Sequence, residues 1–97
     1  IALADAVAKP VVLRPGVVSR PHFHDEQDEL YFVHRGRARF DVGGDTFELG
    51  PGGVVHVEST TPRRITSIGD EDLVLLVVGA KDGYVGRDGH LAPADAF

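Results

Sequence analysis

Residues 16–36 read GVVSRPHFHDEQDELYFVHRG, and this stretch decides both the fold and the candidate site. His22 and His24 lie two positions apart, so on a β-strand both imidazoles leave the same face. Glu29 follows a short acidic loop and shares the alternation of Tyr31, which we expect to point inward. The three side chains should therefore meet in one cavity. Two neutral imidazoles and one carboxylate form a facial set with open positions, which suits iron(II), manganese or a related divalent metal.

Short runs rich in β-branched and aromatic residues surround this stretch, and glycine and proline separate them. Such spacing predicts many short strands joined by tight turns. The best helix candidate is Leu3–Ala8, which is short enough to be marginal alone. Eight strands with almost no helix indicate an all-β jelly roll or small barrel. The expected strands are Val11–Arg14, Pro21–His24, Glu29–Arg35, Arg37–Val42, Thr46–Leu49, Val54–Val57, Arg63–Ile68 and Asp72–Val78.

Alternation along the predicted strands assigns residues to the two faces of each sheet. Tyr31 and Phe40 are expected to line the interior, whereas Leu30 and Phe32 are apolar but fall on the outward side. Apolar side chains on an outer face, together with exposed sheet edges, favour a covering partner. We therefore expect a homodimer in which a second copy covers this face.

The stretch resembles the first motif of the cupin family, and each anchoring position matches: Gly16, His22, His24, Glu29 and Gly36. The resemblance implies an antiparallel double-stranded β-helix, or jelly-roll barrel, with a metal held between the sheets. It extends to about residue 78. We accordingly expect a single cupin domain over residues 1–97, with a barrel core at about 11–79 and a C-terminal loop segment at 80–97.

The second cupin motif is degenerate here, because Arg63 stands where the family has its fourth metal ligand. A guanidinium stays protonated and has no lone pair to donate. One alternative is a three-ligand site with an extra open position. Another is that Arg63 pairs with Glu29 in a metal-free cavity, and a third places Arg63 on the surface beside Arg64. If metal and Arg63 coexist, an anionic ligand would bridge them. Arg63 and Tyr31 are therefore the candidate ligand-binding residues.

The other histidines are expected to face solvent. His34 and His56 fall on the outward alternation of their strands, and His56 would become a ligand only if the register were shifted by one residue. His90 lies in the C-terminal segment. The acidic loop residues Asp25, Glu26 and Asp28 are expected to be solvated, since runs of charge usually lie on the surface.

Composition excludes several kinds of protein. Ninety-seven residues, 42% of them hydrophobic and 26% charged, suit one globular domain. A net charge of -5 without a basic stripe argues against nucleic acid as a partner. No cysteine is present, so thiolate metal sites and disulfides are excluded. The longest apolar run, Leu73–Ala80, is too short to span a membrane, and residues 1–8 make a poor signal peptide. We expect a cytoplasmic location and no membrane association.

Two functional hypotheses remain open. The first is a small metalloenzyme with iron, manganese, nickel or zinc on His22, His24 and Glu29. The resemblance to cupins implies an oxygenase, isomerase or decarboxylase, although no residue is assigned a catalytic role. The second is a non-catalytic module that binds a sugar-like or carboxylate small molecule. Metal content distinguishes them, and fold alone does not choose a chemistry.

Overall fold

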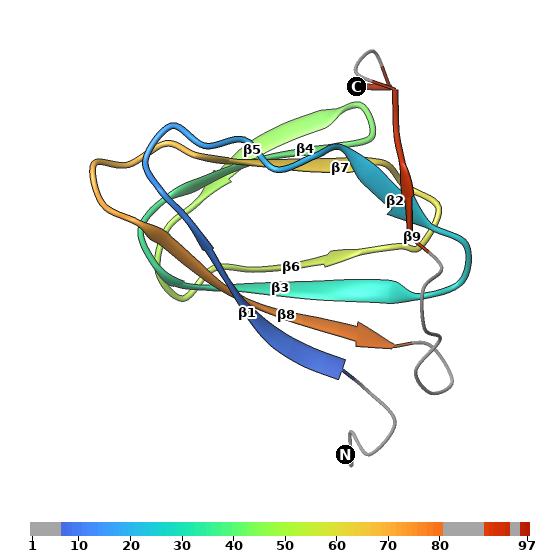
Figure 1. Cartoon of the computed structure of the whole chain (residues 1–97), viewed down its shortest axis with the longest axis horizontal. Coiled ribbons are helices and arrows are strands. Elements are labelled where there is room, and N and C mark those ends of the chain that lie inside the picture. The colour runs from blue at the N-terminus through green and yellow to red at the C-terminus, as the bar shows by residue number, and fades with distance from the viewer. Residues whose placement is uncertain (1–6, 81–88, 94–95) are drawn as a thin grey trace.

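The computed structural model describes residues 7–80, 89–93 and 96–97. Within these residues the chain forms nine β-strands and no helix (Figure 1). It follows that the described residues contain no helix long and apolar enough to cross a membrane. The strands are β1 (Val7–Leu13), β2 (His22–His24), β3 (Asp28–Arg35), β4 (Ala38–Val42), β5 (Asp45–Leu49), β6 (Val54–Val57), β7 (Arg63–Ser67), β8 (Leu73–Ala80) and β9 (Gly89–Leu91).

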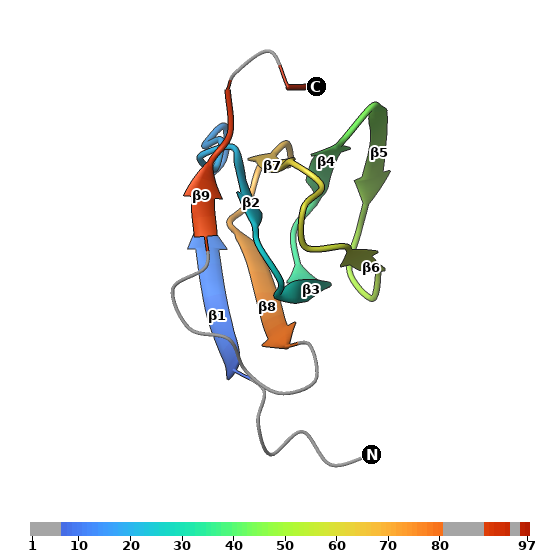
Figure 2. The ribbon, with the colours of Figure 1, turned by 90° about the vertical axis from the view of Figure 1, so that its right-hand side faces the viewer.

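The strands form two antiparallel sheets that face each other (Figures 1 and 2). One sheet has the order β1-β8-β3-β6, and the other has the order β5-β4-β7-β2-β9. The chain crosses between the sheets from β2 to β3 and again from β3 to β4. This architecture is the double-stranded β-helix that the resemblance implied. The crossing from β2 to β3 matters for function, because it allows side chains of these two strands to meet between the sheets.

The core lies between the two sheets and confirms the predicted alternation. Tyr31, Val33 and Phe40 are buried, whereas Leu30 is exposed. The Phe40 ring packs edge-on against Tyr31 and stacks on Phe47, with 5.6 Å between ring centroids in both pairs. Full burial of a phenylalanine side chain contributes roughly 1.5–3 kcal/mol. The sheets are therefore held together by large side chains from β3, β4 and β5.

Gly36 closes the turn between β3 and β4, where only glycine fits. Its φ of +82° lies in the left-handed region. A Cβ at this position would also lie 2.6 Å from the backbone oxygen of Asp72. The glycine at the end of the motif is thus required by the backbone on two separate grounds.

All eight expected strands are present, and the differences lie at the two ends of the chain. β1 begins at Val7 rather than Val11, so the helix predicted over Leu3–Ala8 is wrong at Val7 and Ala8; the rest of that prediction lies outside the described residues. The physical reason is that β1 pairs with β8 in continuous register from Val7 to Leu13. Pro10 is tolerated because β1 is an edge strand of its sheet.

The C-terminal segment contains a strand where a loop was expected. β9 pairs with β2, and His22 lies opposite Leu91 while His24 lies opposite Gly89. Residues 81–88 and 94–95, also part of the expected loop, lie outside the described residues. Because β9 extends the sheet beyond β2, both histidines of the motif lie on an internal strand of that sheet.

Candidate metal site

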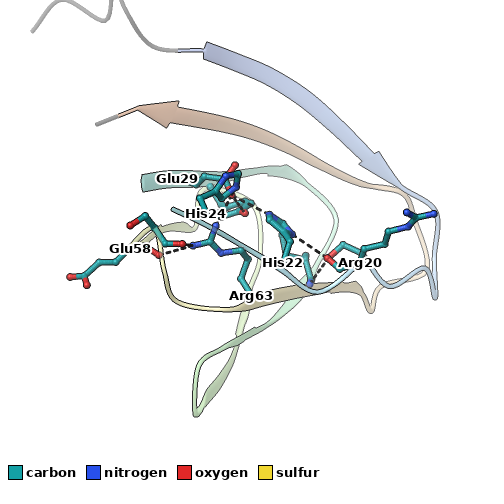
Figure 3. Close-up of polar contacts among 10 residues, drawn as sticks. Arg20, His22, His24, Glu29, Glu58 and Arg63 are labelled. Carbon is teal, nitrogen blue, oxygen red and sulfur yellow. Dashed lines mark hydrogen bonds and ion pairs between the residues drawn. The ribbon is translucent and has the colours of Figure 1, made fainter. Parts of the chain in front are cut away.

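The candidate site forms where β2 and β7 of one sheet face β3 of the other. β2 supplies His22 and His24, β3 supplies Glu29, and β7 supplies Arg63, which lies directly opposite His22 in the β2–β7 pair. Figure 3 shows the two imidazoles and the guanidinium gathered around Glu29. The three metal ligands predicted from the sequence are therefore brought together.

Four side chains converge on a single oxygen, the Oε1 of Glu29. The Nε2 atoms of His22 and His24 lie 3.3 and 3.2 Å from it. The Tyr31 hydroxyl donates a hydrogen bond of 2.5 Å to it, and the Nη1 of Arg63 lies at 3.1 Å. Glu29 is 5% exposed, so this carboxylate is held almost entirely by protein groups.

These contacts set the charge state of the buried pair Glu29 and Tyr31. Burial alone would raise the pKa of Glu29, but hydrogen bonding with His22 and Tyr31, with the charges of His24 and Arg63, lowers it to about 2. Burial, followed by the neighbouring Glu29 charge, raises the pKa of Tyr31 above its usual value. Glu29 is therefore a carboxylate and Tyr31 a neutral donor at neutral pH.

The hydrogen bonds of His22 show which of its nitrogens is available to a metal. The Nδ1 of His22 lies 3.1 Å from the Arg20 carbonyl, and in the tautomer that donates to this carbonyl the hydrogen is on Nδ1. In the neutral imidazole, Nε2 then holds a lone pair that faces Glu29 Oε1. In this tautomer the Nε2 lone pair is available to a metal ion. A carbonyl partner on the far nitrogen is also how proteins orient metal-binding histidines.

The donor set fits a divalent metal. The ligand atoms of His22, His24 and Glu29 all lie within 4.8 Å of one another. Nitrogen and oxygen ligands bind such ions at about 2.0–2.2 Å and lie about 3–4 Å apart around one ion. Small side-chain movements are enough to bring the three ligand atoms to these distances.

Arg63 is completely buried, so the interpretation of a surface arginine is wrong. Its Nη2 donates to the backbone oxygens of Glu58 and Ser59, at 2.6 and 3.2 Å. These two carbonyls fix the guanidinium, whose Nη1 reaches Glu29. Arg63 contacts one carboxylate oxygen, and a carboxylate has two. Arg63 contacts Oε1, the same oxygen that faces both imidazoles, so the pair agrees with the charge-replacement alternative, and a metal would share this oxygen with the guanidinium or use the other one.

The remaining histidines lie away from the site. His34 and His56 are exposed, as expected, and His56 pairs with Asp28 at 3.2 Å. His90 is exposed, pairs with Asp25 at 2.9 Å and stacks on Phe23. The exception among the loop acids is Asp28, which was expected to be solvated. It opens β3, is half-buried and accepts a 2.9 Å hydrogen bond from the backbone N–H of Ser59.

A cavity of about 120 Å³ adjoins the site between the sheets. His22, Glu29 and Tyr31 form its polar wall, and most of the remaining wall is apolar. Two further lining residues, Lys9 and Ser19, were missed by the sequence analysis. Lys9 shares the alternation of Val11 and Leu13, which would have placed it inward had the strand been extended through Pro10. The apolar lining residues are Val11, Leu13, Ile65, Leu75 and Val77.

Two facing antiparallel sheets with a His-His-Glu set between them define a jelly-roll protein with a candidate metal site. A family model described as Cupin domain matches residues 11–79, and the chain belongs to the cupin family. An uncharacterised protein of Streptomyces coelicolor is 42% identical over 59 residues, covering 61% of this chain and 52% of the relative. The chain spans about half the length of the curated relatives it matches.

Solved structures show the same fold. A DMSP lyase from Ruegeria pomeroyi is 28% identical with a TM-score of 0.78, and the match covers 91% of this chain and 43% of that one. A predicted oxalate decarboxylase from Thermotoga maritima is 26% identical with a TM-score of 0.73, covering 77% of this chain and 66% of that one. This chain is therefore similar in fold to proteins named for acting on small molecules.

Proposed function

We propose that this chain binds a divalent transition metal through His22, His24 and Glu29 and acts on a small molecule in the adjoining cavity. The observation that carries the proposal is the convergence of three ligand atoms, the Nε2 atoms of His22 and His24 and the Oε1 of Glu29, within 4.8 Å of one another. With the Nδ1 of His22 donating to the Arg20 carbonyl, its Nε2 faces Glu29 with a lone pair. A divalent metal would engage all three ligand atoms.

A metal bound at three protein ligands keeps open positions and can polarise a bound oxygen of a small molecule. The chain's own residues would orient that molecule. The Tyr31 hydroxyl and the Arg63 guanidinium both contact the Glu29 carboxylate, so they hold this proposed metal ligand in place. Through these contacts they act as positioning residues, as partners behind metal ligands generally do.

The type of reaction is left open in this proposal. The similar structures named as a lyase and a decarboxylase support a small-molecule substrate, in agreement with the cavity beside the ligands. We propose iron, manganese, nickel or zinc as the metal, because two imidazoles and a carboxylate suit this group of ions.

A second candidate function is a metal-free binding module, which the buried ion pair between Arg63 and Glu29 favours. The guanidinium is fully buried and lies 3.1 Å from Glu29 Oε1, so it already supplies a positive charge to this carboxylate. The cavity would then hold a sugar-like or carboxylate ligand without metal chemistry.

Metal content tests the two functions directly. Tag-free protein is incubated separately with iron(II), manganese, nickel and zinc, desalted, and measured by elemental analysis. The variant His22→Ala, His24→Ala removes both imidazoles of the site, and His34→Ala, His56→Ala is the matched control because both of those side chains are exposed. The proposal expects about one ion per chain in the parent and the control, and none in the site variant. Equal metal in both variants would overturn it.

We also propose that the outer face of the β1-β8-β3-β6 sheet packs on a second copy of this chain. Val12, Leu30, Val54 and Leu76 are each at least 40% exposed on it. Apolar side chains gathered on one sheet face indicate an interaction surface. Light scattering after size exclusion should show a dimer, and Leu30→Glu with Leu76→Glu should shift it to monomer. A parent that is monomeric at high concentration would contradict this.

A further inference from the structure

We infer that the cavity selects small monoanions with a short apolar body, and that the Lys9 ammonium at β1 is the charge partner of the anion. This inference deepens the proposed function and rests on the cavity binding a small molecule. It is stated for the metal-free protein, because a divalent metal at His22, His24 and Glu29 would itself favour an anion.

The register of the sheet places Lys9 on the inward face. Lys9 lies opposite Val77, and Val77 lies opposite Tyr31, so the three residues form one row across β1, β8 and β3. Directly opposite residues of antiparallel strands point to the same side of the sheet. Val77 and Tyr31 are buried in the interior, and all three residues line the cavity. Lys9 therefore borders the cavity from the edge strand, and its side chain is exposed.

The charge balance of the cavity wall leaves Lys9 uncompensated. Lys9 and Glu29 are the lysine and the carboxylate that line it, and His22 lines it as well. Glu29 already faces the buried guanidinium of Arg63 at 3.1 Å, which offsets its charge. Among the described residues, no ion pair involves Lys9. A ligand entering this cavity consequently meets a net positive wall, and an anion is favoured over a neutral or cationic molecule.

The rest of the wall defines the body of the ligand. Ser19 accepts a 2.9 Å hydrogen bond from the backbone N–H of Ile65, and its own hydroxyl hydrogen can still be donated to an anion. Apart from Lys9, His22, Glu29 and Tyr31, the remaining side chains along the cavity are aliphatic. A cavity of about 150 Å³ is known to hold a benzene-sized molecule. The volume of about 120 Å³ here thus suits a ligand of roughly six non-hydrogen atoms.

The alternative to ligand binding is a purely structural role for Lys9. Inward-pointing charges on edge strands protect sheets against edge-to-edge pairing. That role requires no preference for charge in a bound ligand. A direct comparison of a charged and a neutral ligand of equal size therefore separates the two roles.

The probe ligands are butyrate and its neutral counterpart butyramide, each with six non-hydrogen atoms, and acetate as the shorter anion. Binding is followed in methyl-labelled protein, because the methyl signals of Val11, Ile65 and Leu75 report on the cavity wall. We expect butyrate to shift these signals and to bind at least about fivefold more tightly than butyramide. Each CH₂ group added from acetate to butyrate should raise the affinity roughly fourfold.

The variants assign the charge preference to one side chain. Lys9→Met should reduce the ratio of butyrate to butyramide affinity to near one, and Lys9→Arg should keep it. Arg39→Gln is the matched control, because Arg39 is an exposed cation on the outer face of β4, and it should leave the ratio unchanged. The methyl spectrum of each variant reports folding in the same sample.

Three outcomes would overturn the inference: no shift of cavity methyls with any probe, equal affinities for butyrate and butyramide, or a preference that persists in Lys9→Met. Metal titration of the same samples keeps the two proposals separate. Metal binding without a charge preference removes only the role of Lys9. A Lys9-dependent preference without metal binding removes only the metal site.

Discussion

Arg63 and Glu29, 34 residues apart in the chain, form an ion pair between the two sheets with 3.1 Å between Nη1 and Oε1. The side chain of Arg63 is fully buried and that of Glu29 is 7% exposed. Removing two charges from water is costly, and the pair is tolerated because each member has several partners. The contact joins β7 to β3 at the polar end of the core, so it links the stability of the fold to the chemistry of the site.

A double-mutant cycle should reveal strong coupling between these two residues. Arg63→Met leaves a buried carboxylate without its guanidinium, and we expect a loss of about 3–5 kcal/mol in the free energy of unfolding. Arg63→Met combined with Glu29→Gln should lose less than the sum of the single variants, by about 1–3 kcal/mol. Urea unfolding in the presence of a chelator measures this. Strict additivity would contradict the coupling.

Replacing Arg63 with a residue that can donate a lone pair should strengthen metal binding. Arg63 lies opposite His22 and at Glu29, beside the proposed ligands. Arg63→His supplies a third imidazole there, and we expect the zinc affinity to rise at least tenfold in competition with a chelator. Arg64→His is the control, because Arg64 pairs with Asp41 at 3.0 Å instead. An unchanged affinity in Arg63→His would show that position 63 does not reach the metal.

Asp41 should make the fold less stable as the pH falls into the acid range. Burial would raise its pKa, but the hydrogen bonds from Thr46 and Arg64 and the positive charge of Arg64 lower the pKa below the ordinary 3.8. A lowered pKa in the fold contributes stability that is fully present above the unfolded pKa and is lost as the pH falls through the folded one.

The stability advantage of the parent over Asp41→Asn should accordingly be constant near neutral pH and shrink as the pH falls below about 4. Urea unfolding of both proteins between pH 7 and pH 2 measures it. Thr46→Val removes one hydrogen bond to Asp41, at 2.9 Å, and should reproduce part of the loss. A stability advantage of the parent that grows as the pH falls would contradict this prediction.

Gly36 should be intolerant of even a methyl group. Gly36→Ala forces a Cβ to 2.6 Å from the Asp72 backbone oxygen and holds alanine at φ +82°. We expect a loss of at least about 1–3 kcal/mol, the usual cost of a backbone held in this region. Gly44→Ala is the matched control, because nothing lies within 4 Å of its Cβ position. Thermal unfolding of both variants tests the difference, and equal losses would contradict the argument.

The strand pattern and the ligand set were predictable from local sequence. The spacing from His22 to Glu29, with inward Tyr31, depends only on strand alternation and one short loop. The burial of Arg63 could not be decided in this way. Two arginines stand side by side at the start of β7, and the carbonyls of Glu58 and Ser59 select the first of them.

Two other features depend on contacts between distant parts of the chain. β9 is three residues long with no alternation of its own, and it forms because β2 offers an edge to pair with. Lys9 was missed because Pro10 interrupts the strand pattern, although β1 tolerates proline as an edge strand. Such features follow from which strands become neighbours, and local sequence does not specify this.

The most direct test of the central claim is anomalous diffraction from crystals of the protein loaded with manganese or zinc. We predict one anomalous peak per chain, about 2.0–2.2 Å from the Nε2 atoms of His22 and His24 and from a carboxylate oxygen of Glu29. Loaded crystals with no peak between these three side chains, or with the peak at the pair His56 and Asp28 instead, would contradict the account.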